Sequence, residues 1–95
     1  MKLIVDLNII CDAPGTRSHL YAMVRKEFQS DLVPMVGMEF EDPAWKDPRS
    51  IKSILINPTE GYYLLHVGND TLSDRVQCEQ LKQMYHSHGW TGLVR

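Results

Sequence analysis

The stretch IKSILINPTEGYYLLHV, residues 51–67, carries the strongest local signal for the fold. Two runs rich in β-branched, leucine and aromatic residues, 51–56 and 62–67, flank the segment Asn57-Pro58-Thr59-Glu60-Gly61. Proline suits the first central position of a type I turn, and glycine suits the left-handed position that follows it. The stretch therefore predicts a β-hairpin.

Both faces of this hairpin are apolar. We assign one face to Ile54, Ile56, Tyr62 and Leu64, and the other to Leu55, Tyr63, Leu65 and Val67. A sheet with helices on one side leaves its other face to solvent in a domain of this size. Two apolar faces therefore indicate that a second subunit covers one of them.

The N-terminal residues 1–11 alternate as a strand with one buried face does. The positions that share this face are Leu3, Val5, Leu7, Ile9 and Cys11. Ile4 and Ile10 make the second face partly apolar as well. A strand that is apolar on both faces is typical of the centre of a sheet, so we expect a central strand here.

A helix is expected over residues 16–30, because Leu20, Met23, Val24 and Phe28 recur at helical spacing. Residues 33–41 alternate in polarity and predict a second strand, whose Pro34 places its start at an edge or a bulge. Two Asp-Pro pairs, at residues 42–43 and 47–48, predict a rigid loop.

A second helix follows the hairpin. Thr71 and Asp74 fit a capping box at its start, and Gly89 fits the residue after its end. Residues 93–94 are candidates for a short last strand. The chain is thus expected to be a single α+β domain over residues 1–95, ordered β-α-β-β-β-α(-β), with an antiparallel meander and two helices packed on one face of the sheet.

The composition excludes several classes of protein. The 95 residues carry a net charge of −2, and the basic residues are scattered, which makes a nucleic-acid binder an unlikely class. An alternative nucleic-acid interface would use Arg17, Arg25 and Lys26 of the first predicted helix. Two cysteines form no disulfide framework, and the sequence shows neither a signal peptide nor a membrane span, so a cytoplasmic protein is expected.

The segment Cys11-Asp12-Ala13-Pro14-Gly15-Thr16-Arg17-Ser18 has the spacing C-x5-R-S, between a predicted strand and a predicted helix. It resembles the phosphate-binding loop of cysteine-dependent phosphatases and arsenate reductases. In that family the N–H groups of the loop and an arginine surround an oxyanion, and the helix N-terminus lowers the pKa of the cysteine.

The resemblance implies a set of roles. Cys11 would be the nucleophile, Arg17 the phosphate clamp, and Ser18 a hydroxyl that assists the leaving thiolate. Asp42 or Asp47 would be the general acid. The alternative interpretation is a strand that ends in a Pro-Gly turn, with the Cys11 thiol directed into the core.

No ligand set for a metal and no cofactor motif is found. His86 and His88 are two residues apart, so they point in different directions on a helix. The leading hypothesis is a non-enzymatic interaction module that binds a second copy, or another protein, through the apolar hairpin. Its candidate contact residues are Ile54, Ile56, Tyr62, Leu64 and Trp45, because aromatic residues dominate interface hot spots.

Overall fold

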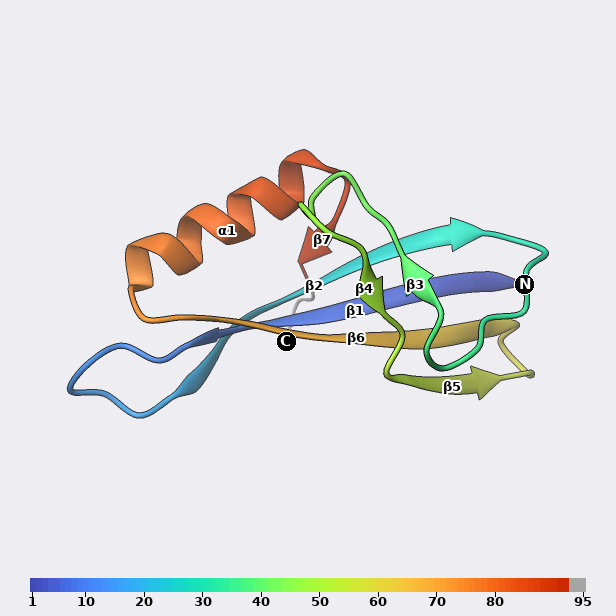
Figure 1. The fold of residues 1–95 in the computed structure, drawn as a ribbon, viewed down its shortest axis with the longest axis horizontal. Coiled ribbons are helices and arrows are strands. Elements are labelled where there is room, and N and C mark those ends of the chain that lie inside the picture. The colour runs from blue at the N-terminus through green and yellow to red at the C-terminus, as the bar shows by residue number, and fades with distance from the viewer. Residues whose placement is uncertain (93–95) are drawn as a thin grey trace.

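The computed structural model describes residues 1–92 and shows a mixed α+β fold with one helix (Figure 1). The elements follow in the order β1 (Lys2–Cys11), β2 (His19–Gln29), β3 (Glu39–Phe40), β4 (Arg49–Ser50), β5 (Ser53–Asn57), β6 (Tyr62–Leu72), α1 (Arg75–Ser87) and β7 (Thr91–Gly92). The candidate last strand at residues 93–94 lies outside the described residues.

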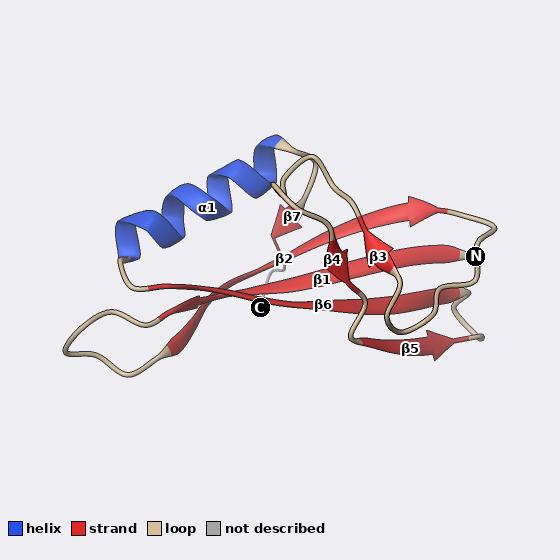
Figure 2. Ribbon diagram, in the orientation of Figure 1, coloured by secondary structure: helices blue, strands red, loops and turns tan. Residues whose placement is uncertain are grey.

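A five-stranded sheet in the order β5-β6-β1-β2-β7 forms the body of the molecule, and β3 and β4 form a separate two-stranded sheet (Figure 2). β1 is the middle strand, as its two apolar faces predicted. It pairs with β2 in antiparallel and with β6 in parallel orientation. The expected meander is therefore wrong, because β6 pairs with its hairpin partner β5 on one side and with β1, in parallel orientation, on the other.

The alternating residues of β1 are the centre of the core. The exposed fractions of Leu3, Val5, Leu7, Ile9 and Cys11 are all 6% or less. Buried residues of β6, α1 and the segment before β7 pack in the same cluster, and so does Ile51. α1 and the loop that carries β3 and β4 thus cover a single face of the sheet.

The predicted helix over residues 16–30 is wrong, since this segment is the strand β2. Leu20, Val24 and Phe28 are spaced by four, an interval that is compatible with both a helix and a strand. Only Met23 favoured the helix. Pairing along the whole of β1 places Val24 beside Leu7 and Phe28 beside Leu3. The distant strand β1 therefore determines that this segment is a strand and not a helix.

The predicted strand over residues 33–41 is reduced to β3, which spans Glu39–Phe40. Gly37 adopts a φ of 92°, and Met38 donates its N–H to the carbonyl of Met35 at 3.1 Å. This turn interrupts the extended backbone on which the alternation depended. Residues 31–38 form an extended loop instead, and most of their side chains are exposed.

The helix α1 confirms one predicted boundary and corrects the other. Asp74 is its N-cap and accepts a hydrogen bond from the N–H of Val76 at 2.8 Å. Thr71 is not part of the cap, because it pairs with Ile10 as a residue of β6. Gly89 follows the helix with a φ of 87°, as expected of a C-terminal glycine.

The predicted hairpin is present as β5 and β6, but its faces differ from those expected. Its register pairs Asn57 with Tyr62 and Ile56 with Tyr63 across a turn that ends at Gly61. The sequence grouping assumed that Ile56 and Tyr62 share a face. The observed register shifts β6 by one position relative to β5, so Ile54 and Ile56 share a face with Tyr63 and Leu65 instead.

Candidate functional site

The residues of the predicted phosphate-binding loop are not arranged as the resemblance implies. Cys11 is 1% exposed and belongs to the core, whereas Arg17 and Ser18 are exposed. The loop closes with a hydrogen bond from the Thr16 hydroxyl to the Ala13 carbonyl at 2.9 Å and leads into a strand. Because a strand follows, this loop has no helix N-terminus to stabilise a thiolate or an oxyanion.

The two cysteines lie beside each other in the core. Cys78 of α1 is fully buried, and its Sγ lies 3.8 Å from the carbonyl oxygen of Ile10. Burial, and then the contact with Cys11, raises the pKa of the Cys78 thiol. Cys11, the nucleophile that the resemblance implies, is buried in the same core, whereas a reactive cysteine needs a partly exposed, electropositive surrounding.

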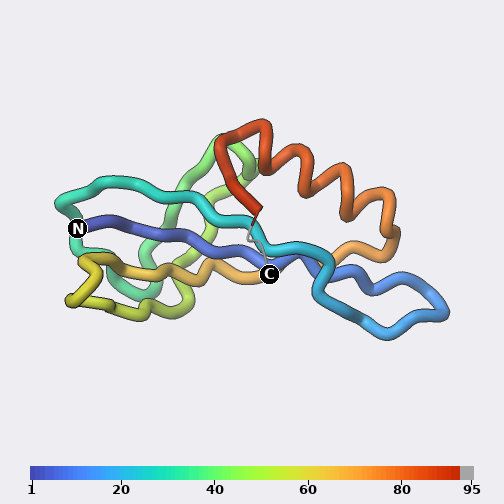
Figure 3. Tube along the Cα trace, turned by 180° about the vertical axis from the view of Figure 1, so that it is seen from behind, coloured from blue at the N-terminus to red at the C-terminus, as the bar shows by residue number. Residues whose placement is uncertain are grey.

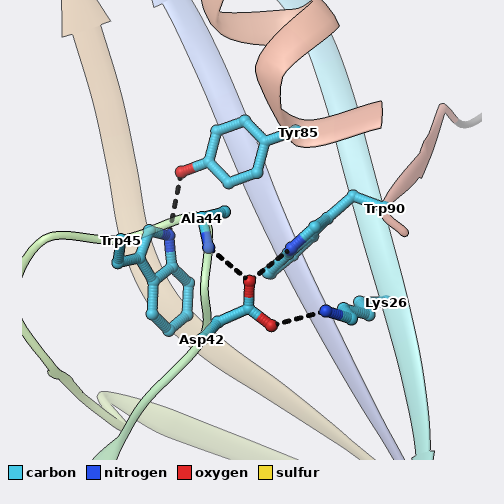
Figure 4. Close-up of polar contacts among 6 residues, drawn as sticks. All are labelled: Lys26, Asp42, Ala44, Trp45, Tyr85 and Trp90. Carbon is cyan, nitrogen blue, oxygen red and sulfur yellow. Dashed lines mark hydrogen bonds and ion pairs between the residues drawn. The ribbon is translucent and has the colours of Figure 1, made fainter. Parts of the chain in front are cut away.

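The two candidate general acids occupy different environments. Asp47 is exposed, whereas the side chain of Asp42 is only 1% exposed. Asp42 lies in the loop between β3 and β4, and Figure 4 shows its carboxylate directed toward Lys26 of β2 and Trp90, which follows α1. Its carboxylate accepts hydrogen bonds from the Lys26 ammonium at 2.7 Å, the Trp90 indole N–H at 2.9 Å and the Ala44 N–H at 2.9 Å.

The charge of Asp42 is stabilised by these partners. Burial alone would raise the pKa of Asp42, but the hydrogen bonds from Lys26, Trp90 and Ala44 outweigh burial and hold it below its ordinary value. A carboxylate that stays ionised and is surrounded by three donors has no proton to deliver. In this position Asp42 joins the loop to the sheet.

A second polar network lies next to the first. The Tyr85 hydroxyl accepts the indole N–H of Trp45 at 2.9 Å (Figure 4). The same hydroxyl donates to Asp70 at 2.6 Å. Arg49 donates to the other oxygen of Asp70 at 2.6 Å and lies over the Trp45 ring. Burial, and then the bond to Asp70, raises the pKa of Tyr85. Trp45, a candidate interface residue, is thus partly buried in this network.

Two open pockets border these networks. One, of about 320 Å³, is lined by residues that include Trp45, Arg49, Asp70 and Tyr85. The other, of about 340 Å³, lies beside Asp42. Within residues 1–92, no buried side-chain nitrogen or oxygen lacks a hydrogen-bond partner, so neither pocket presents a buried polar group that waits for a ligand.

The hairpin residues expected to form one contact face are divided between two. Ile54 and Ile56 pair with Leu65 and Tyr63 on the face that α1 covers. Tyr62 and Leu64 lie on the opposite face, where Leu55 pairs with Leu64. Leu55 and Ile56 are the exposed large apolar residues of the hairpin, at 56% and 55%.

The largest apolar surface was not predicted from the sequence. The described residues expose nine large apolar side chains. Eight of them belong to three segments, the N-terminus, the loop after β2 and β5, whose backbones lie at the same end of the molecule (Figures 1 and 3). We call this set the apolar patch; its members are Met1, Leu32, Val33, Met35, Val36, Met38, Leu55 and Ile56. The predicted strand over residues 33–41 had assigned part of it to a sheet.

The remaining predicted sites do not come together either. Arg25 and Lys26 are neighbours in a strand and so face opposite sides of the sheet, where they bind Asp6 and Asp42. No group of three or more metal-ligating side chains is assembled in the part of the chain that the structure describes. Among the same residues, no helix is long and apolar enough to cross a membrane.

No protein-family model, curated protein or solved structure matches this chain.

Proposed function

We propose that the chain is a non-enzymatic interaction module that self-associates as a homodimer through the apolar patch. The observation that carries this proposal is the concentration of exposed apolar side chains in one region. Their exposed fractions range from 42% for Met38 to 70% for Leu32. Single exposed apolar residues are ordinary, but a set of eight in one region is not.

The size of the apolar patch supports a protein partner. Its eight side chains are each between 42% and 70% exposed. Contiguous apolar patches larger than a few hundred Å² are typical of surfaces that bind another protein. The exposed charged residues Asp31, Glu39 and Lys52 flank the apolar segments, as the polar rim of an interface does.

The residue types of the patch also suit an interface. Met35 and Met38 have unbranched, polarisable side chains that adapt to the shape of a neighbour. Pro34, in the same loop, is buried and fixes its own φ. The loop therefore presents adaptable side chains from a partly restrained backbone, which lowers the entropy lost on binding.

Sedimentation velocity over a range of chain concentrations tests this proposal. We expect a monomer–dimer equilibrium with a dissociation constant in the micromolar range or below. A chain that stays monomeric at hundreds of micromolar would contradict the proposal.

Val36 and Val76 provide a matched pair of substitutions. Val36 lies in the patch and is 64% exposed, whereas Val76 lies on α1 and is 63% exposed. We expect Val36→Lys to weaken the dimer by about tenfold or more, which corresponds to roughly 1.4 kcal/mol or more. Val76→Lys should leave the dissociation constant unchanged. Equal effects of the two substitutions would count against the patch as the interface.

A further inference from the structure

The strand β5 is the outermost strand of the sheet and is left unprotected (Figures 1 and 2). Its five residues, Ser53–Asn57, include neither a charge nor a proline. Edge strands of soluble proteins usually carry a charge, a proline, a bulge or a cover that prevents another strand from adding to them. β5 is short, but among the described residues it has none of these other devices.

The backbone of β5 is paired on one side only. Its ladder connects it to β6, and among the described residues no strand lies on its other side. At the opposite side of the sheet, β7 spans Thr91–Gly92 among the described residues and pairs with Val24 and Arg25 of β2. β5 offers an unpaired edge along Ser53–Asn57, and it also contributes Leu55 and Ile56 to the apolar patch.

We infer that a second copy of the chain adds to this edge, so that the two β5 strands pair in antiparallel orientation about a two-fold axis at Leu55. The inference rests on the proposed self-association and specifies its geometry. The two five-stranded sheets then become one continuous sheet through the dimer.

The sequence of β5 is compatible with its own reverse in this register. Leu55 lies opposite its own counterpart, Ile54 lies opposite Ile56 of the second copy, and Ser53 lies opposite Asn57. Apolar residues thus face apolar residues in the middle, and polar residues face polar residues at both ends. Strand β5 brings no like charges together, in contrast to an edge that is protected by lysines.

The residues that flank β5 restrict the register. Moving the axis by one residue toward the C-terminus would place Pro58, which has no N–H, opposite Ile54. Moving it by one residue toward the N-terminus would place the ammonium of Lys52 opposite Ile56. A register with the axis between two residues, for example with Leu55 opposite Ile54, would turn one copy over. The face of the sheet that α1 covers in one copy would then lie beside the uncovered face of the other. An axis at Leu55 avoids all three conflicts.

The loop of the apolar patch is positioned to take part. The N–H of Gly37 donates to the carbonyl of Ile51 at 2.8 Å, and Ile51 donates to the carbonyl of Met38 at 2.8 Å. These bonds hold the end of the loop beside the residue that lies two positions before β5. A two-fold axis at β5 then places the loops of both copies on the same face of the joined sheet, one on each side of the axis.

Cysteine cross-linking tests this register in the full-length chain. Residues directly opposite in an antiparallel pair have Cα atoms about 4.5–5.5 Å apart, which a disulfide spans, whereas a diagonal pair is about 7–8 Å apart. We expect Leu55→Cys alone to form a covalent dimer with a mild oxidant. Ile54→Cys and Ile56→Cys should stay monomeric on a non-reducing gel when separate and should cross-link when mixed.

The outcomes separate the inference from the proposal on which it rests. A dimeric wild-type chain whose Leu55→Cys variant does not cross-link overturns the β5 geometry and leaves self-association intact. Cross-linking of Ile54→Cys or Ile56→Cys alone also overturns it, because it indicates a shifted axis. A monomeric wild-type chain overturns both. Leu55 is 56% exposed, so we expect its replacement by cysteine to leave the fold intact. The wild-type chain, whose two cysteines are buried, serves as the control.

Discussion

Replacement of Asp42 by alanine provides a strong test of the buried network. Asp42 is the buried charged residue in the described part of the chain, and three donors surround its carboxylate. Asp42→Ala removes the common acceptor of these donors. It leaves the Lys26 ammonium, the Trp90 indole N–H and the Ala44 N–H without their partner.

The cost can be worked from the burial of each group. Breaking a buried ion pair by removal of one partner costs about 3–5 kcal/mol. The side chain of Lys26 is 19% exposed, so its ammonium regains some water and this term lies near the lower limit. The Trp90 side chain is buried and its unpaired N–H adds about 1–2 kcal/mol. We therefore expect a loss of about 4 kcal/mol, which is a large part of the roughly 5–10 kcal/mol of a domain this size.

Equilibrium unfolding in urea, followed by tryptophan fluorescence, measures this loss. Both tryptophans contact the network, so the fluorescence reports on its disruption directly. All variants are compared at one chain concentration, because linked association adds to the apparent stability.

Asp47→Ala is the matched control. Asp47 also precedes a proline in the same loop, but it is exposed. Its replacement should change the free energy of unfolding by less than about 0.5 kcal/mol. If Asp42→Ala costs less than about 1 kcal/mol more than Asp47→Ala, the network does not fasten the loop, and the reasoning from burial fails.

Three further predictions follow from individual residues. The folded state lowers the pKa of Asp42. Its contribution to stability is therefore fully present above its unfolded pKa of about 3.9 and is lost as the pH falls through the lower folded pKa. The difference in unfolding free energy between the wild type and Asp42→Asn should be constant near neutral pH and shrink as the pH falls below about 4; a difference that stays constant at acidic pH would contradict this. The buried thiols of Cys11 and Cys78 should resist alkylation in the native chain and react in urea, as mass spectrometry can show; rapid native labelling of Cys11 would favour the phosphatase interpretation instead. Gly61 has a φ of 79°, and no atom lies where a Cβ would be added. Gly61→Ala should therefore lower the free energy of unfolding in urea by about 1 kcal/mol through backbone strain alone. An unchanged urea midpoint would argue against that turn conformation.

The elements that the sequence predicted correctly have local causes. The alternation of residues 1–11 identified the central strand and its buried face. The Asn57–Gly61 turn identified the hairpin, and Gly89 identified the end of α1. In each case the residues that cause the structure lie within a few positions of one another, so the pattern needs no distant partner.

The errors have non-local causes. Residues 20, 24 and 28 fit a helix and a strand equally, and only the pairing of β2 along β1 distinguishes the two. The residues of β6 were assigned to the wrong faces because the register depends on whether Asn57 belongs to the turn or to the strand. The extended pattern of residues 33–41 failed at Gly37, whose positive φ forms a turn.

The candidate site shows the same division. The sequence drew attention to Cys11, Trp45 and Asp42 as chemically notable residues, but not to what surrounds them. Lys26 and Trp90 are 16 and 48 positions away from Asp42, and no spacing rule connects them. The apolar residues of the patch are evident in the sequence, but the sequence does not indicate that their side chains are exposed.

The sequence by itself determined a central first strand, one hairpin and the capped end of one helix. Only the tertiary structure decided that residues 19–29 are a strand, that β6 pairs with β1, that Asp42 is buried and that the loop of residues 31–38 remains exposed. The physical reason is that turns and caps are stabilised by neighbouring residues, whereas strand pairing and burial depend on segments that meet only when the chain folds.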